Sequence, residues 1–354
     1  MKKGIPQMKK RICSVLMAAF CAFAFTACNG ENNSSDDSSN SSSFSDPVDS
    51  GNSSSTDENS KSPEKVTIAA LNGPTGMGMV KLMDDDEKND YGYDFILSGS
   101  ADEITPRLIK GEIDIACVPA NLGAVLYSKT SGGVRTLAVN TLGVLYIVEN
   151  GTGVNSVEDL KGKTIYSAGK GATPEYALNF ILKSNNILDD VKIEWKSEHA
   201  ECLAALEANP DAVAMLPQPF ATTAMNKNEN IRIAIDLNDA WDALNLPSSL
   251  LTGIVIVRKE FANEYPKAVE EFLSRYGESV KYVNENVSEA AQLVGKYEIV
   301  PAAVAEKAIS SCHIVCITGA EMKEKLSGYL NVLFEQLPAS VGGAMPNDDF
   351  YYGV

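Results

Sequence analysis

From about residue 63 onward, short runs of apolar residues alternate with longer segments of helical periodicity. The short runs are rich in valine and isoleucine, as in buried strands, and apolar residues in the longer segments recur every three or four positions. Glycine, proline, serine or asparagine usually follows a strand. Repeated strand–helix units predict an α/β fold with largely parallel sheets. The predicted strands cover 65–70, 93–97, 113–118, 135–139, 143–148, 191–195, 212–216, 231–235 and 251–257, with one more directly before residue 167. The predicted helices cover 102–110, 122–129, 175–183, 199–207, 266–286, 288–296, 301–310 and 321–337, with further helices starting at 79 and after 220.

The length of this part of the chain favours two lobes. Roughly 290 residues are more than one ordinary hydrophobic core supports. The strand–helix pattern also starts again after residue 156, and the segment beyond residue 266 is mostly helical.

A glycine-rich turn follows the first predicted strand, in the stretch Leu71–Lys81. Proline and three glycines interrupt the strand here, and a helix starts directly afterwards. Backbone N–H groups at such a helix start lack partners and suit a bound anion or a polar small molecule. The spacing is not that of a nucleotide-binding loop, because Lys81 stands where a third glycine is needed. An ordinary tight turn between strand and helix remains the alternative.

Small polar residues follow most of the predicted strands. In open α/β sheets, ligands bind at the carboxyl ends of the strands, so two facing lobes would form a cleft lined with hydrogen-bond donors. Met77 has core packing as its alternative role, and Lys170 has that of a solvated loop lysine. The expected ligand-binding residues are Asn72, Gly73, Thr75, Gly76, Met77, Ser98, Ser100, Asn121, Leu122, Thr141, Lys170, Gly171, Ala172, Thr173, Gln218 and Thr252.

The sequence offers no obvious nucleophile–base pair, so we expect no catalytic residues. His199 and His313 fall in helical or helix-flanking stretches, and Cys117 and Cys202 fall in a strand and a helix. The segment 312–316 carries two cysteines and a histidine, but two ligands alone make no metal site, so no metal and no cofactor are expected. The sequence leaves open whether any of the cysteines pair.

The chain start has the pattern of a secretory signal. Five basic residues precede a mostly apolar run over 12–27, too short for a comfortable membrane span. The junction Phe25–Cys28 resembles a bacterial lipobox, although leucine is usual where Phe25 stands. The resemblance implies a signal peptide over 1–27 and a lipid anchor at Cys28 on the outer face of the cell membrane. A plain signal peptide or an uncleaved anchor remains the alternative.

Serine, asparagine and acidic residues dominate the segment after Cys28. Such a composition buries too little apolar surface to order itself, so 28–62 is predicted to be a disordered tether. The formal net charge of the full chain is −17, and removing the five basic residues of the signal gives −17 − 5 = −22. This balance argues against nucleic acid as a partner, because nucleic-acid binding requires basic surface.

Three short segments of this sequence resemble recurrent sequence segments of bacterial solute-binding proteins of ABC importers. They are Val157–Ile165, the segment Gly111–Ala116 placed before Pro119–Leu122, and the tail Pro346–Tyr352. The closest branch is the nitrate, sulfonate and taurine type, which includes binders of thiamine-precursor pyrimidines. The resemblance implies a two-lobed periplasmic-binding-protein-like fold of type II, with a ligand cleft between lobes joined by two crossing strands.

The same resemblance implies a function and a division of the chain. The first lobe would comprise 63–147 and 255–354, and the second lobe 148–254. The expected protein is a monomer that captures a small ligand, a sulfonate, nitrate or pyrimidine precursor, and delivers it to a membrane permease. Two alternatives stay open: an enzyme of pyrimidine or vitamin-precursor metabolism on the same scaffold, and a lipid-anchored sensory or adhesion domain.

Overall fold

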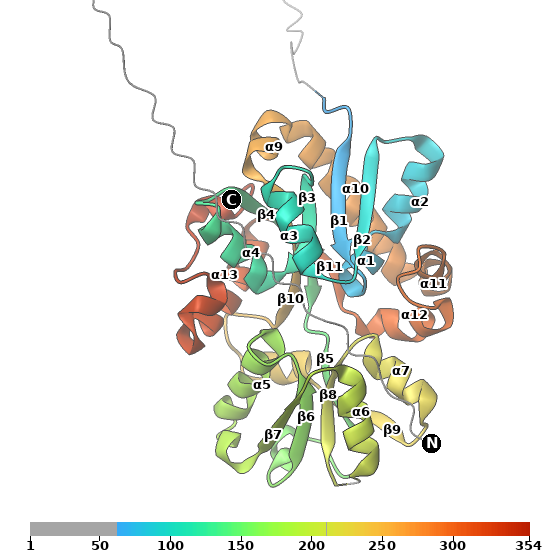
Figure 1. Ribbon diagram of the computed structural model, residues 1–354, viewed down its shortest axis with the longest axis vertical. Helices are drawn as coiled ribbons and strands as arrows, with labels where there is room; N and C mark the ends of the chain where they lie inside the picture. Colours follow the sequence, from blue (N-terminus) through green and yellow to red (C-terminus); the bar gives the residue numbers. More distant parts are fainter. Residues whose placement is uncertain (1–61, 210) are drawn as a thin grey trace, which may run out of the picture. The chain divides into compact units, whose positions relative to one another are not determined.

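Two β-sheets organise the protein, with helices against both faces of each sheet (Figure 1). The structure is a computed structural model that describes residues 62–209 and 211–354. The predicted signal segment, the predicted lipidation site Cys28 and nearly all of the predicted tether lie outside the described residues. The predicted α/β fold with two lobes is confirmed. No helix among the described residues is long and apolar enough to cross a membrane.

Six strands form the first sheet, in the order β11, β4, β10, β3, β1, β2. Strand β1 is parallel to β2 and β3, whereas β10 runs antiparallel to both β3 and β4, and β11 runs antiparallel to β4. The bounds are β1 Val66–Leu71, β2 Tyr93–Ser98, β3 Ile115–Pro119, β4 Val134–Leu142, β10 Leu251–Arg258 and β11 Ile314–Ile317.

Five strands form the second sheet, in the order β7, β6, β8, β5, β9. Strand β6 is parallel to β7 and β8, and β5 is antiparallel to β8 and β9. The strands are β5 Leu145–Asn150, β6 Thr164–Ala168, β7 Lys192–Lys196, β8 Val213–Pro217 and β9 Ile231–Asp236. The helices of this lobe are α5 Thr173–Ser184, α6 His199–Ala208, α7 Phe220–Lys227 and α8 Leu237–Asp242.

The expectation of largely parallel sheets is wrong, because both sheets are mixed. The reason lies in how the chain passes between them. Strand β5 follows β4 after only Gly143 and Val144, so it enters the second sheet at the carboxyl ends of β6 and β8 and runs against them. Strand β10 returns to the first sheet in the same manner after residues 243–250.

Two segments connect the sheets: the first passage is Gly143 and Val144, and the second passage covers residues 243–250. These two passages touch each other. A Cβ atom on Gly143 would lie 2.7 Å from the Leu250 side chain, closer than real Cβ contacts allow. The second passage also lies against helix α13 (Gly319–Gln336), because a Cβ on Gly328 would lie 2.4 Å from the carbonyl oxygen of Pro247. Position 328 therefore requires glycine, because the facing atom belongs to the backbone, whereas a side chain at position 143 would displace the Leu250 side chain. The division of the chain into a first and a second lobe, with boundaries at 147/148 and 254/255, stays a prediction.

Two groups of helices enclose the first sheet. Helices α3, α4 and α13 pack on one face, and α1, α2, α10, α11 and α12 pack on the other. The apolar cluster of the first face continues into the second lobe, since Leu326 and Leu330 of α13 share it with Leu178 and Ile181 of α5. The bounds are α1 Pro74–Met77, α2 Val80–Asn89, α3 Ala101–Ile109, α4 Ala120–Lys129, α9 Lys259–Glu264, α10 Pro266–Glu285, α11 Val287–Lys296, α12 Ala302–Ala308 and α13 Gly319–Gln336.

Candidate functional site

The segment Val157–Ile165, which resembles a recurrent segment of solute-binding proteins, has a structural role. Ser156 and Asp159 form a capping box at the start of a 3-10 turn. Asp159 Oδ2 accepts hydrogen bonds from the backbone N–H groups of Asn155 and Ser156, both at 2.9 Å. Leu160 is buried beneath the turn. This segment therefore holds the chain in position where it enters β6, and it does not form a binding loop.

Acid is expected to weaken this turn. The backbone hydrogen bond from Asn155, followed by the bonds from Ser156, lowers the pKa of Asp159. A carboxylate with a lowered pKa stabilises the fold above its ordinary pKa of about 3.9, and this stabilisation is lost as the pH falls through the lowered value. The melting temperature of Asp159→Asn should therefore lie below that of the unmodified protein at pH 7, and the difference should be smaller at pH 3 than at pH 7.

A matched variant controls for general acid effects. Asp189 is also an exposed aspartate in the first turn of a 3-10 helix, and Asp189→Asn should change the melting temperature little at either pH. A constant difference between Asp159→Asn and the unmodified protein across the whole pH range would contradict the role of the carboxylate.

The glycine-rich turn packs tightly against the protein itself. It contains the single helical turn α1, and a Cβ on Gly76 would lie 2.8 Å from the Leu71 carbonyl oxygen. A Cβ on Gly78 would lie 3.0 Å from the Tyr276 hydroxyl. Met77 is fully buried, with its sulfur 3.9 Å from Cys312 Sγ. Gly73 differs, because its φ is +137° and the space beside it is open.

Two of the predicted threonines, Thr75 and Thr141, lie beside Gly253 of β10, and Thr252 precedes Gly253 on the same strand. A Cβ on Gly253 would lie 2.8 Å from Thr75 Cγ2 and 3.2 Å from Thr141 Oγ1. Thr75 Oγ1 donates to the Leu71 carbonyl oxygen at 3.1 Å, so its hydroxyl proton is in use. The hydroxyl of Thr252 is buried and has no hydrogen-bond partner among the described residues. A buried hydroxyl without a partner is costly unless something binds to it.

Gln218 carries a second partnerless donor, at the end of β8 in the other lobe. Its backbone N–H donates to the Val144 carbonyl oxygen at 2.9 Å, which places it beside the first passage between the sheets. Its Oε1 accepts from both the N–H and the hydroxyl of Thr222, at 3.2 and 2.9 Å. Its Nε2 is buried and, within the described residues, has no acceptor. The amide is thus held by its oxygen with its two N–H groups uncommitted.

Among the described residues, no hydrogen bond or ion pair joins the second-lobe loop 170–173 to Thr75 or Thr141. Lys170, Gly171 and Ala172 are exposed. Thr173 is buried beside Tyr329 of α13: burial raises the pKa of Tyr329, and the nearby Thr173 side chain opposes this rise, although the Tyr329 hydroxyl makes no hydrogen bond of regular geometry. This loop therefore meets the first lobe through α13.

The remaining predicted residues mostly make hydrogen bonds within the protein. The Ser98 hydroxyl lies 2.5 Å from a Glu103 carboxylate oxygen, and the Ser100 hydroxyl caps α3 by accepting from the Asp102 N–H at 3.2 Å. Asn121 donates to the Ser340 carbonyl oxygen at 3.3 Å. Leu122 packs against the core cluster, and Asn72 is exposed with its backbone N–H bonded to Ser98.

A second polar group, which sequence reasoning missed, lies beside the first passage. It consists of Tyr146, Asp236, Asn238 and His313, and it comes from both lobes. Asn238 Oδ1 accepts from the Gly143 N–H at 3.2 Å, and the His313 ring contacts the Gly143 carbonyl oxygen. Asp236 followed by a short apolar–polar run is an N-cap signal that could have revealed α8. No local signal places His313 here, because it precedes β11, a four-residue edge strand.

Hydrogen bonds also bridge the lobes away from the passages. Lys307 of α12 donates to the Asn226 side chain of α7 at 2.7 Å. Gln336 of α13 donates to the Tyr176 carbonyl oxygen of α5 at 3.2 Å. The lobes are therefore in contact on both flanks of the passages, through single side chains that a rotation could break.

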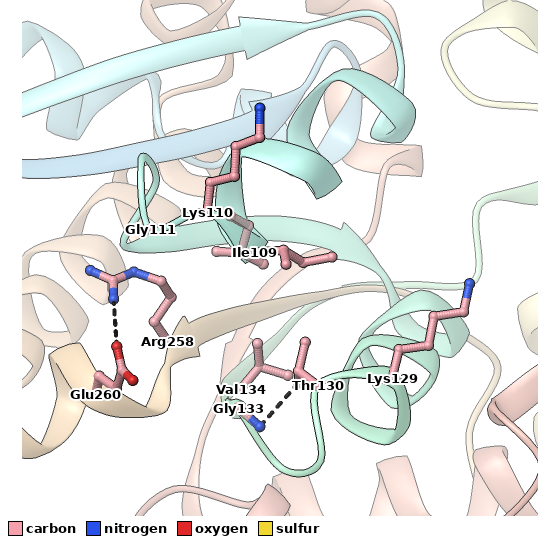
Figure 2. Close-up of a pocket in the computed structure, with 10 residues that line it drawn as sticks. Ile109, Lys110, Gly111, Lys129, Thr130, Gly133, Val134, Arg258 and Glu260 are labelled. Atoms are coloured by element: carbon pink, nitrogen blue, oxygen red, sulfur yellow. Dashed lines mark hydrogen bonds and ion pairs between the residues drawn. The ribbon is translucent and has the colours of Figure 1, made fainter. Parts of the chain in front are cut away.

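A cavity of about 360 Å³ lies at the opposite edge of the first sheet, next to the amino ends of β3 and β4 (Figure 2). Apolar side chains form its floor, and Ile109 at its rim is 55% exposed. Lys110 and Lys129 do not converge on a common point, and Arg258 is paired with Glu260 at 3.6 Å. The cavity is therefore separate from the polar groups at the passages and lacks a focused charge. Its other lining residues are Leu108, Gly111, Thr130, Gly133 and Val134.

The cysteines of the described part are free, and their thiols are poor nucleophiles. Burial raises the pKa of Cys117 and of Cys312 to about 12, and that of Cys202 and of Cys316 to about 11. These thiols are neutral at pH 7, whereas the thiolate is the reactive form. No group of three histidine, cysteine, aspartate or glutamate side chains in the described residues could hold a metal ion.

Comparison with known proteins agrees with this architecture. Residues 134–290 match the family described as NMT1/THI5 like. No curated protein sequence matches the chain. A solved structure of an ABC transporter protein from Parabacteroides distasonis has a TM-score of 0.70 and 23% identity, covering 82% of this chain and 99% of that chain.

Two structures of sulfonate-binding proteins are also similar. The periplasmic aliphatic sulphonate-binding protein SsuA from Escherichia coli has a TM-score of 0.65 and 17% identity, covering 80% of this chain and 91% of that one. The alkanesulfonate-binding SsuA from Xanthomonas axonopodis bound to MOPS has a TM-score of 0.57 and 13% identity, covering 81% and 96%. At these identities the likeness concerns the fold. The resemblance inferred from the sequence is thus confirmed: residues 134–290 match the NMT1/THI5-like family, and the chain has the periplasmic-binding-protein fold of ABC-importer solute-binding proteins.

Proposed function

We propose that this protein is the solute-binding component of an ABC importer. The observation that carries the proposal concerns two of the buried polar groups that lack a partner among the described residues, Thr252 in β10 of the first sheet and Gln218 directly after β8 of the second sheet. They lie at the carboxyl edges of the two sheets, where α/β proteins bind ligands. The structural neighbours whose names state sulfonate binding support the same assignment.

The ligand class is a small organic or anionic molecule held mainly by neutral donors. Gln218, Thr75, Thr141 and Thr252 carry amide and hydroxyl groups, and none of them carries charge. A sulfonate, nitrate or a pyrimidine precursor fits such a site. The protein binds its ligand by closing two lobes and presents the closed form to a membrane permease. It acts as a monomer outside the cytoplasm, tethered by a lipid at Cys28, and it does no chemistry on the ligand.

The test is a binding screen of the purified protein against alkanesulfonates, nitrate and pyrimidines. Thermal shift would identify hits, and calorimetry would give the affinity. Mass spectrometry of each hit after incubation would detect any product. Binding with the ligand recovered intact supports the importer role, whereas product formation supports the enzyme alternative. A well-folded sample that binds none of these compounds would overturn the proposal.

The hit identified in that screen should lose affinity when Gln218 is changed to alanine. Losing one good hydrogen bond in a buried site costs about 1–3 kcal/mol, so the dissociation constant should rise roughly 5- to 150-fold. Asn331→Ala is the matched control, because Asn331 is exposed on α13 and donates only to Glu335 in its own helix. Equal affinities for the two variants would remove Gln218 from the site.

A further inference from the structure

The second lobe contains another buried nitrogen without a partner, besides Gln218 Nε2. It is Nδ1 of His199, which has no hydrogen-bond partner among the described residues. His199 is the first residue of α6, and Phe220 is the first residue of α7. The two rings lie 5.7 Å apart with an interplanar angle of 46°. The helical stretch around His199 gave no reason to expect a role in binding, but its unpartnered nitrogen does.

Strand direction brings these residues to one edge of the second sheet. Strands β7 and β8 are both parallel to β6; two residues separate the end of β7 from His199, and Gln218 directly follows β8. Gln218 Oε1 accepts from the Thr222 N–H, so the amide lies on the same turn of α7 that carries the Phe220 ring. Helices α6 and α7 share one apolar cluster (Figure 1). His199, Gln218 and Phe220 therefore form one group, at the edge where α/β proteins bind ligands.

This group combines aromatic surface with neutral hydrogen-bonding nitrogens. His199 and Phe220 are only partly buried, so part of each ring is open to solvent. Burial lowers the pKa of His199, and the charge of Glu198 opposes this change, so the imidazole is neutral at pH 7. The Gln218 amide offers N–H groups, and a neutral imidazole has one donor and one acceptor nitrogen. A flat ring with polar atoms on its edge can stack on Phe220 and bond to the two nitrogens.

The charges around this group disfavour an anion. Glu198 precedes α6, and Glu201 lies in its first turn. The first turns of α6 and α7 contain no lysine or arginine. Lys196, at the end of β7, is paired with Glu194 at 3.4 Å, and Lys170 lies in the exposed loop after β6. A sulfonate or nitrate placed on this group would therefore face like charge, whereas an uncharged ligand would not.

We propose that His199 and Phe220 belong to the binding site together with Gln218, and that this part of the site takes a neutral planar nitrogen heterocycle. The face of the ligand ring lies on Phe220. Gln218 Nε2 donates to a ring nitrogen or a carbonyl oxygen on its edge, and His199 Nδ1 bonds to a further polar atom of that edge. This inference rests on the proposed function, and it narrows the ligand class to uncharged heterocycles.

Paired probes test the ligand class. Calorimetry at pH 7.5 compares three neutral heterocycles, cytosine, uracil and 4-aminopyrimidine, with three anions, methanesulfonate, ethanesulfonate and nitrate. At least one heterocycle should bind with a dissociation constant roughly tenfold or more below that of every anion. A smaller difference, or an anion that binds more tightly, would overturn this inference and leave the importer proposal intact. Failure of every compound to bind would overturn both.

Variants test the residues, with the heterocycle that binds most tightly as the probe. Phe220→Leu keeps an apolar contact with the core but removes the ring, so the dissociation constant should rise about tenfold. His199→Leu should raise it by a similar factor. His199→Asn, which puts an amide near the position of Nδ1, should restore part of the loss. Phe180→Leu is the matched control, because Phe180 is also partly buried against a ring, Trp241 at 4.5 Å, but belongs to α5.

The melting temperature of each variant separates loss of binding from loss of fold. Unchanged dissociation constants in Phe220→Leu and His199→Leu, or an equal rise in the control Phe180→Leu, would remove both residues from the site. A measurement on the unmodified protein guards against variants that fold poorly. The chain has two histidines, so isotope labelling of histidine gives two ring systems. A nuclear Overhauser effect between the bound heterocycle and the His199 ring is expected, and its absence would contradict the proposal.

Discussion

Replacing Asp114 by alanine is expected to lower the free energy of unfolding by about 3 kcal/mol, as for other broken buried ion pairs. Asp114 Oδ1 accepts from Arg258 Nη2 at 2.6 Å, and Oδ2 accepts from the Thr67 N–H at 2.9 Å. Arg258 also donates to the Ile113 carbonyl oxygen at 3.1 Å. One carboxylate therefore joins the starts of β1 and β3 to the end of β10. Its loss leaves the largely buried Arg258 guanidinium with only the exposed Glu260 as an ionic partner.

Asp94 provides the matched control for this variant. It also pairs with a cation at the edge of the first sheet, Lys65 at 2.6 Å, but both side chains are more than half exposed. Exposed pairs contribute little, so Asp94→Ala should cost less than about 1 kcal/mol. The measurement is the midpoint of urea unfolding at constant slope. Equal shifts for the two variants would show that the position of Asp114 at three strands confers no special stability.

Replacing Gly328 by alanine is expected to destabilise the protein by about 2 kcal/mol, although alanine ordinarily favours a helix. Gly328 lies within α13, and an added Cβ would meet the Pro247 carbonyl oxygen at 2.4 Å and Ser248 at 2.9 Å. The first of these atoms belongs to the backbone of the second passage, so neither side can yield without moving α13 away. Overpacking of this kind costs about 1–3 kcal/mol.

Gly277→Ala should have the opposite sign. Gly277 also lies inside a long helix, α10, but the nearest atom to an added Cβ is Cys316 Sγ at 3.9 Å, an ordinary contact. Removing the backbone freedom of glycine should therefore stabilise the protein by about 0.5–1 kcal/mol. Urea unfolding of both variants checks the pair. A stabilising Gly328→Ala would show that the second passage is not held against α13 in solution.

The repeating strand–helix pattern was sufficient to predict the two-lobed α/β fold. Buried strands such as β3 and β10 carry continuous apolar runs, and helices such as α10 show a clear apolar stripe. Strand β11 and helix α8 were missed because four and six residues are too few to show a period. The mixed direction of the strands was also missed, since it depends on where the chain passes from one sheet to the other.

The candidate site was predictable by residue type but only partly by residue. Small polar residues after strands led to Thr75 and Thr141, which lie together at Gly253, and their role in binding a ligand stays a prediction. Ser98 and Ser100 belong to the same class, yet Ser100 caps α3 and the Ser98 hydroxyl bonds to Glu103 of the same helix. A hydroxyl at the end of a strand can serve the backbone or a ligand, and local sequence does not distinguish the two uses.

The sequence by itself determined the local elements, the fold class and the family resemblance, because periodicity and turn chemistry are properties of neighbouring residues. Only the tertiary structure decided which distant polar groups meet. His313 and Asp236 come together because β11 begins and β9 ends beside the same passage, and Asp114 reaches Arg258 because β10 returns next to β3. Such contacts depend on strand order and direction, which are set by the packing of the whole chain.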